Sequence, residues 1–252
     1  MQAETAWLIL VVLVTLRVLP LFLLAPVFGS APAPALFRAA LAFALAAALV
    51  SATGVRLAQP PASVERLALL AANELALGAA LAFGVAAAFA AFLFGGRLLD
   101  LQFGFGVANL IDPVTHTQAP LLGIGLNLLA VTVFFLLDGH HLLIRALAAS
   151  LERFPPGRSI TELGLGAVAG HAGGMFTFGL MLVAPAVLAV LLLDIGFALA
   201  ARAMPQMNVF IVAIPFKIAV GLLVLAASLR YLGTAMGRAF ESIFRYWQAL
   251  LS

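Results

Sequence analysis

Five ionisable residues stand inside long apolar runs of the sequence, where either chemistry or pairing must explain them. They are Arg17, Glu74, Asp138, Asp194 and Lys217. Each would cost several kcal/mol if its charge faced lipid, so each is expected to face protein or water. One interpretation is an ion or proton pathway, and the other is structural pairing with a neighbouring subunit or helix. We favour pairing, because a proton relay usually repeats carboxylates along one face, whereas Glu74 and Asp194 stand alone.

The stretch Asp138-Gly139-His140-His141 places metal-ligating residue types in immediate succession. Adjacent histidines on a helix point about 100° apart, so they are not expected to converge on one ion as a pair spaced i, i+4 does. We therefore interpret the stretch as a polar break at a helix end and predict no metal site. The sequence also lacks a recognisable catalytic serine arrangement, paired carboxylates and a phosphate-binding loop. It predicts neither an enzyme nor a bound cofactor.

The composition requires an apolar environment for most of the chain's surface. Of the 252 residues, 65% are hydrophobic and 9% are charged, whereas soluble domains carry about 25% charged residues. So few charges cannot cover a water-soluble globule, which makes lipid or other apolar subunits the expected surroundings. The chain has no cysteine, which excludes disulfides and thiolate sites. Its net charge of +3 comes from scattered residues and indicates no nucleic-acid partner.

Six apolar segments are candidates for crossing a bilayer. They comprise residues 6–28, 35–55, 67–94, 121–137, 165–193 and 209–229. The third segment exceeds the ~20 residues that one crossing needs, and the fourth can continue past Asp138 to residue 151. Glycine and proline in the connectors end helices for steric reasons. The predicted fold is an all-α membrane protein of about six apolar helices.

The arginines that flank these segments predict an orientation in the membrane. The odd-numbered connectors contain Arg38, Arg97 and Arg202. The even-numbered connectors and the C-terminal part contain Arg56, Arg66, Arg145, Arg153, Arg158, Arg230, Arg238 and Arg245. Since positive charge accumulates on the cytoplasmic side, this asymmetry favours cytoplasmic termini if all six segments cross.

The central segment, residues 98–120, reads LLDLQFGFGVANLIDPVTHTQAP and need not be helical. Gly104 and Gly106 permit backbone conformations that are closed to other residues. Irregular backbone at membrane depth is tolerated only where protein buries it or where it lines a cavity. The side chains that would close a pore by dewetting and steric fill are Phe103, Phe105, Val107, Leu110 and Ile111. The alternative is a packed re-entrant loop without a gating role.

A series of motifs, none of them specific alone, follows in order along nearly the whole chain. They are Arg17 with Ala25-Pro26-Val27-Phe28, Asn73-Glu74 with Gly78, Leu101-Gln102-Phe103-Gly104-Phe105 with Asp112-Pro113, Asp138-Gly139-His140, Phe154-Pro155 with Gly157, and the block from Ala201 to Phe210 that leads to Pro215, Lys217 and Gly221. In this order and spacing the chain resembles the FliR family of flagellar type III export gate subunits. More loosely, it resembles the virulence-system counterpart, the SctT family.

The resemblance implies a structural and gating subunit rather than an enzyme. Such a subunit would form, with FliP and FliQ chains, a channel for unfolded flagellar proteins in the bacterial inner membrane, at the flagellar basal body. FlhB and FlhA would be further partners. Residues 1–165 would be FliP-like, residues 166–252 would be a FliQ-like helical hairpin, and the helices would form bent hairpins. Within the family, an injectisome gate is the alternative. The alternative outside the family is a transporter of a small solute, but such a transporter would require internal repeats, and the sequence contains no convincing one.

The resemblance also implies roles for three sets of residues. The plug loop would comprise Gln102, Phe103, Gly104, Phe105, Gly106, Val107, Leu110, Ile111, Asp112 and Pro113. Arg17, Glu74 and Lys217 would be buried charges that contact neighbouring subunits or helices. An entrance tip near FlhB would comprise Pro205, Gln206 and Asn208. The resemblance implies that this tip faces the cytoplasm, whereas the arginine count places it on the other side of the membrane. We follow the resemblance, because the count assumes that each segment crosses the membrane independently.

Overall fold

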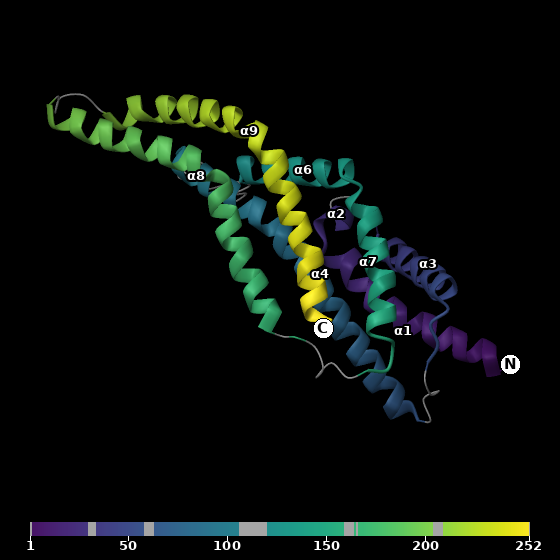
Figure 1. Cartoon of the computed structure of the whole chain (residues 1–252). Helices are drawn as coiled ribbons and strands as arrows, with labels where there is room; N and C mark the ends of the chain where they lie inside the picture. Colours follow the sequence, from purple (N-terminus) through teal and green to yellow (C-terminus); the bar gives the residue numbers. More distant parts are fainter. Residues whose placement is uncertain are drawn as a thin grey trace. The chain divides into compact units, whose positions relative to one another are not determined.

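In the part of the chain that the computed structural model describes, the regular elements are α-helices, as the sequence predicts. The structure describes residues 2–29, 34–57, 63–105, 120–158, 164, 166–203 and 209–251. The helices are α1 (Gln2–Leu24), α2 (Pro26–Gly29), α3 (Ala35–Thr53), α4 (Val64–Gln102), α6 (Leu121–Leu136), α7 (Gly139–Arg153), α8 (Gly166–Ala203) and α9 (Val209–Leu250), as Figure 1 shows.

Five of these helices are long and apolar enough to cross a membrane. They are Glu4–Leu24, Ala35–Thr53, Val64–Gln102, Gly166–Ala203 and Val212–Leu250. The pair α6 and α7 is bent by 70° and supplies a sixth span if it is counted as one. The prediction of about six apolar helices is therefore confirmed. The prediction placed the end of the last helix too early, at residue 229, because residues 230–250 mix charged and apolar residues and form a helix without an apolar run.

The break between α6 and α7 lies at Asp138, as predicted. Asp138 has φ 54°, and it is the one non-glycine residue with a positive φ in the described part of the chain. Aspartate tolerates this left-handed conformation better than most residues. A larger residue does not fit at the next position, Gly139, unless Phe134 moves, because a Cβ there would lie 2.4 Å from the Phe134 ring.

The described chain forms two compact units, and each unit combines separate stretches of sequence. Unit 1 contains Met1–Ala88, Phe134–Ala172 and Phe240–Ser252, and unit 2 contains Phe89–Val133 and Gly173–Ala239. Four helices, α4, α6, α8 and α9, contribute to both units. The predicted division at residue 165 concerns likeness to FliP and FliQ rather than packing, so it stays a prediction.

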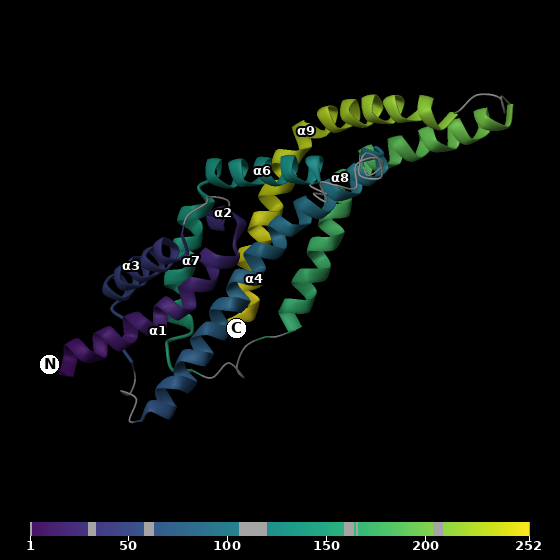
Figure 2. The same cartoon turned by 180° about the vertical axis from the view of Figure 1, so that it is seen from behind.

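Unit 1 is held together by α1 packing on α3 and by aromatic side chains that bond to the main chain of α4 (Figures 1 and 2). The Tyr246 hydroxyl donates to the carbonyl of Ala80 at 2.8 Å, and the Trp247 indole donates to Leu81 at 3.0 Å. Gly84 makes this possible, because a Cβ there would lie 2.4 Å from the Tyr246 ring. Aromatic donors thus fix the last turns of α9 against α4 within this unit.

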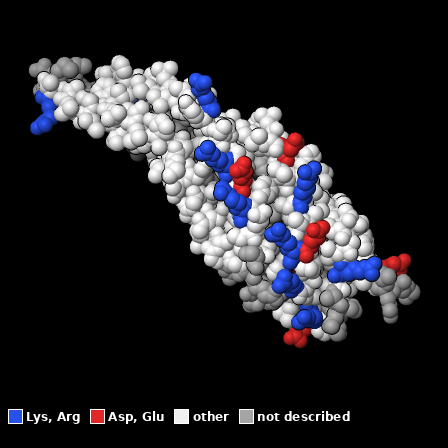
Figure 3. Space-filling view, viewed as in Figure 1, with Lys and Arg blue, Asp and Glu red and all other residues white. Residues whose placement is uncertain are grey.

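Unit 2 is built on the antiparallel hairpin of α8 and α9, which both ribbon views show (Figures 1 and 2). Ring contacts join this unit's part of α4 to α8, with Phe94 and Phe176 at a centroid distance of 5.2 Å. Gly95 and Gly179 allow the two backbones to approach closely, since a Cβ on Gly95 would lie 2.8 Å from the Gly179 carbonyl oxygen. On the face that Figure 3 shows, the hairpin carries few charged side chains, as expected for a segment in lipid or against apolar protein.

Candidate functional site

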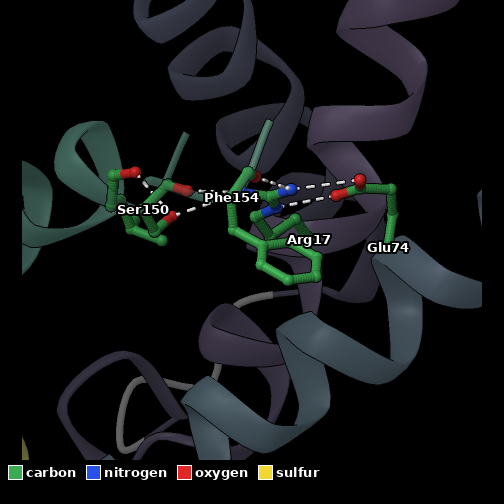
Figure 4. A network of polar contacts seen from close by, with 5 residues as sticks. Arg17, Glu74, Ser150 and Phe154 are labelled. Atoms are coloured by element: carbon green, nitrogen blue, oxygen red, sulfur yellow. Dashed lines mark hydrogen bonds and ion pairs between the residues drawn. The ribbon is translucent and has the colours of Figure 1, made fainter. Parts of the chain in front are cut away.

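A buried ion pair between Arg17 on α1 and Glu74 on α4 lies in unit 1 (Figure 4). The Arg17 side chain is 0% exposed and the Glu74 side chain is 2% exposed. Arg17 Nε donates to Glu74 Oε2 at 2.6 Å, and Nη2 donates to Oε1 at 3.0 Å. This two-bond geometry is the strongest way in which a guanidinium binds a carboxylate.

The rest of the guanidinium binds the C-terminal end of α7, which Figure 4 shows beside it. Arg17 Nη1 donates to the Ser150 carbonyl at 3.1 Å and to its hydroxyl at 3.5 Å, and Nη2 donates to the Phe154 carbonyl at 2.9 Å. The carbonyls at the end of a helix carry partial negative charge, and the Ser150 carbonyl accepts the Arg17 bond in addition to one from the Phe154 N–H. All five N–H donors of the guanidinium are therefore satisfied within one chain.

A close crossing of α1 and α4 makes this pair possible. Gly78 lies one turn after Glu74 on the same face of α4, and a Cβ there would lie 2.3 Å from the Arg17 carbonyl oxygen. The sequence predicted partners for both charges on neighbouring subunits or helices. In the structure Arg17 and Glu74 pair with each other, from helices of the same chain, and their role in subunit contacts stays a prediction.

A second ion pair joins the two helices of the hairpin in unit 2. Lys217 Nζ of α9 contacts the Asp194 carboxylate of α8, and the two side chains are 21% and 35% exposed. Asp194 and Lys217 thus form an ion pair between two helices of the same chain. Since both side chains keep some exposure, this pair remains open to a neighbouring chain in a way that Arg17 and Glu74 do not.

The described part of the predicted plug loop comprises Gln102, Phe103, Gly104 and Phe105. The helix α4 ends at Gln102, and Gly104 has φ 84°, as expected of an irregular segment. Phe103 is fully buried, and a Cβ on Gly221 of α9 would lie 2.2 Å from its ring. The ring of Phe105 lies 6.2 Å from that of Phe103. The Phe103 side chain is thus packed inside unit 2, where it anchors the start of the loop.

The remaining predicted site residues lie outside the described part of the chain. They are Gly106, Val107, Leu110, Ile111, Asp112 and Pro113 of the plug loop, and Pro205, Gln206 and Asn208 of the entrance tip. Their roles stay predictions.

The break at Asp138 brings together three side chains that could each offer one ligand atom to a metal ion. Each of Asp138, His140 and His141 offers one such atom, and these three atoms lie within 4.8 Å of one another. The centroids of the two imidazole rings lie 4.1 Å apart, so the expectation that these adjacent histidines would not converge is wrong. His141 Nδ1 already lies 3.2 Å from Asp138 Oδ1, whereas His140 Nδ1 is buried without a partner among the described residues.

We expect export to persist when both histidines are replaced by alanine. The side chains of Asp138 and His141 are 72% and 61% exposed, and an exposed pair of this kind contributes about 0–1 kcal/mol to stability. Motility of cells that carry the double variant His140→Ala, His141→Ala checks this expectation. Loss of motility with normal amounts of the protein in the membrane would contradict it and would point to a functional metal or proton site.

The apolar helices, the internal ion pairs and the bent helix pair define a multi-span α-helical membrane protein. The model of the family described as bacterial export proteins, family 1, matches residues 8–243, and the chain belongs to this family. The resemblance to FliR that the motifs indicate is confirmed.

Individual relatives agree with this family. The chain is 30% identical to the flagellar biosynthetic protein FliR of Bacillus subtilis over 246 residues, which cover 95% of this chain and 93% of that protein. It is 28% identical to FliR of Escherichia coli over 248 residues, or 98% and 94% of the two chains. The Yop proteins translocation protein T of Yersinia pestis is 29% identical over 162 residues, or 63% and 62% of the two chains. The flagellar relatives therefore match a larger share of the chain.

Proposed function

We propose that this chain is a structural and gating subunit of a flagellar type III export gate in the bacterial inner membrane. The observation that carries the proposal is the near full-length similarity to flagellar FliR proteins, within a family of export proteins that matches residues 8–243. In this role the chain contributes helices and a seal and has no catalytic function. Energy for export would come from other components.

The exposed apolar surface of α8 supports assembly with other membrane subunits. Its large exposed hydrophobic residues are Phe176, Leu180, Met181, Leu188, Leu191, Leu192, Ile195 and Leu199. Five of them, Leu188, Leu191, Leu192, Ile195 and Leu199, follow Pro185, and at about 100° per residue they fall on one face about 100° wide. The helix has 38 residues and a length of about 57 Å, whereas the hydrocarbon core of a bilayer is ~30 Å thick. This length favours apolar subunits, in addition to lipid, as cover for the exposed face.

The partners that we propose follow from the FliR resemblance. FliP and FliQ chains would complete a helical assembly at the basal body, with residues 1–165 in a FliP-like position and residues 166–252 in a FliQ-like position. FlhB would bind near Pro205, Gln206 and Asn208, and FlhA and exported flagellar proteins would meet the gate from the same side. The Lys217–Asp194 pair lies on the proposed FliQ-like hairpin and keeps partial exposure, which suits a contact between subunits.

Co-purification tests the assembly. The tagged chain, expressed with FliP-like and FliQ-like chains, is expected to yield one stable complex in mild detergent and to restore motility in cells that lack their own FliR. A monomer that transports a labelled small solute in liposomes would overturn the proposal in favour of a transporter. Restored secretion by an injectisome, without restored motility, would support the virulence-type gate that the Yersinia relative represents.

A deletion tests the gating role of the central loop. Removing Gly104 to Gly106 shortens the segment after the Phe103 anchor and is expected to make the cell membrane leaky to small ions while the complex still assembles. The physical reason is that an apolar segment seals a narrow bore by steric fill and dewetting. Unchanged ion permeability, measured in cells with a normally assembled complex, would contradict the gating role.

A further inference from the structure

The break between α6 and α7 gathers metal-ligating side chains in unit 1. Asp138 lies in the break itself, and His140 and His141 lie in the first turn of α7. All three residues belong to the stretch Phe134–Ala172 of this unit. The three ligand atoms that they offer lie within 4.8 Å of one another. One short stretch of chain thus supplies two imidazoles and a carboxylate to the same place.

The separations between these atoms are close to those that a metal ion requires. Zinc holds nitrogen and oxygen ligands at about 2.0–2.2 Å, so two ligand atoms of a tetrahedral ion lie about 3.3 Å apart. His141 Nδ1 and Asp138 Oδ1 lie 3.2 Å apart. The most distant pair of ligand atoms exceeds the required separation by about 1.5 Å at most. Rotation of the Asp138 and His141 side chains, which are 72% and 61% exposed, can close this gap.

His140 brings a ring nitrogen that the fold leaves without a partner. Its Nδ1 atom is buried and has no hydrogen-bond partner among the described residues. A neutral imidazole carries its proton on one nitrogen and a free lone pair on the other, and that lone pair is a common metal donor. Because a buried polar atom without a partner is costly, an ion bound through this nitrogen would remove a cost that the protein alone does not remove.

The Asp138 carboxylate is available to an ion and makes a cation tolerable at this position. Asp138 precedes the first residue of α7, where an aspartate commonly accepts a bond from the helix backbone. Here its side chain makes no such capping bond. The start of a helix carries partial positive charge, which disfavours a cation, and the negative charge of the carboxylate offsets this effect.

We propose that Asp138, His140 and His141 bind a divalent transition-metal ion, at what we call the corner site. Zinc, cobalt and nickel ions accept two imidazole nitrogens and a carboxylate oxygen, whereas Mg²⁺ and Ca²⁺ prefer oxygen ligands. Water completes the coordination. The ion ties the break to the first turn of α7 and stiffens the corner between α6 and α7. The corner site goes beyond the gating function and does not depend on it, and export does not require the ion.

Metal titration tests the corner site. The full-length chain, purified in mild detergent through a tag without histidine, is expected to bind Zn²⁺ and to melt at a higher temperature when Zn²⁺ is present. The double variant His140→Ala, His141→Ala is expected to lose at least about 100-fold in affinity, since even a partner of a metal ligand contributes about 10–100-fold. Co²⁺ reports the ligands directly, because its visible absorption depends on their number and geometry. We expect this absorption from the unchanged chain and its loss in the double variant.

Two single changes provide matched controls. Asp138→Asn keeps the left-handed backbone, which asparagine tolerates as aspartate does, and is expected to weaken Zn²⁺ binding about tenfold or more. Glu152→Gln removes an exposed carboxylate from α7 outside the corner site and is expected to leave binding unchanged. If the double variant folds poorly, Asp138→Asn decides. Equal Zn²⁺ affinity in the unchanged chain and these site variants, or no binding by the unchanged chain, would overturn the corner site. Either result leaves the gating function standing, because that function is tested by ion leakage and export.

Discussion

Replacing Glu74 with alanine is expected to destabilise the folded chain by about 3–5 kcal/mol, because the Arg17 guanidinium would stay buried without its counter-charge. Arg17 cannot reach water by a small movement, since its side chain is 0% exposed and α1 contacts α4 at Gly78. The variant is therefore expected at strongly reduced levels in the membrane. Thermal unfolding of the purified complex, compared with the unchanged complex, measures the loss.

Two variants control for this result. Glu65→Ala removes an exposed carboxylate from the same helix and is expected to change stability by less than ~0.5 kcal/mol. The double variant Arg17→Met, Glu74→Leu replaces the pair by apolar groups and should be more stable than Glu74→Ala, because no unpaired charge remains. If Glu74→Ala proves as stable as Glu65→Ala, the ion pair does not hold α1 and α4 together.

Replacing Phe103 with alanine is expected to cost about 3–5 kcal/mol, which is typical of a buried phenylalanine. The ring is fully buried and lies over Gly221, so its removal leaves a cavity at the base of the central loop. We expect the complex to melt at lower temperature and the cells to leak small ions, since the loop loses its anchor. Normal melting and normal ion permeability together would contradict the anchoring role.

Alanine substitutions at two glycines of α9, one that contacts Phe103 and one that does not, are expected to change stability in opposite directions. Gly221→Ala places a Cβ 2.2 Å from the Phe103 ring and is expected to destabilise. Gly233→Ala meets nothing within 4 Å, so it is expected to stabilise α9 by about 0.5–1 kcal/mol through its helix propensity. Melting temperatures of the two variants provide the comparison, and equal shifts would show that Gly221 is not a contact point.

The features that the sequence predicted are those that depend on neighbours along the chain. Apolar runs marked the helices because crossing a bilayer needs ~20 consecutive apolar residues. Gly104 indicated an irregular backbone, and its φ of 84° agrees. The polar residues after Leu137 indicated a break, and the helix breaks at Asp138. Periodic patterns along one segment carry these signals, so one sequence suffices to see them.

The features that the sequence did not predict depend on partners far apart in the chain. Arg17 and Glu74 are 57 residues apart, and nothing in their surroundings indicates which charge meets which. Nothing in the sequence marks the carbonyls of Ser150 and Phe154 as partners of Arg17, because every residue has a backbone carbonyl. The bonds that the Asp100 carboxylate accepts from backbone N–H groups of α6 are equally unmarked. Tyr246 and Trp247 were not recognised either, although buried aromatic donors near a C-terminal helix end commonly seek a carbonyl.

The Arg17 network also sets an order of events during synthesis of the chain. Arg17 is translated 57 residues before Glu74 and 137 residues before Phe154. At about 5–20 residues per second, the last of these partners emerges about 7–27 s after the arginine. Until Glu74 of α4 has been made, the first helix carries a cation without its counter-charge. The remaining donors of the guanidinium have to wait for the end of α7.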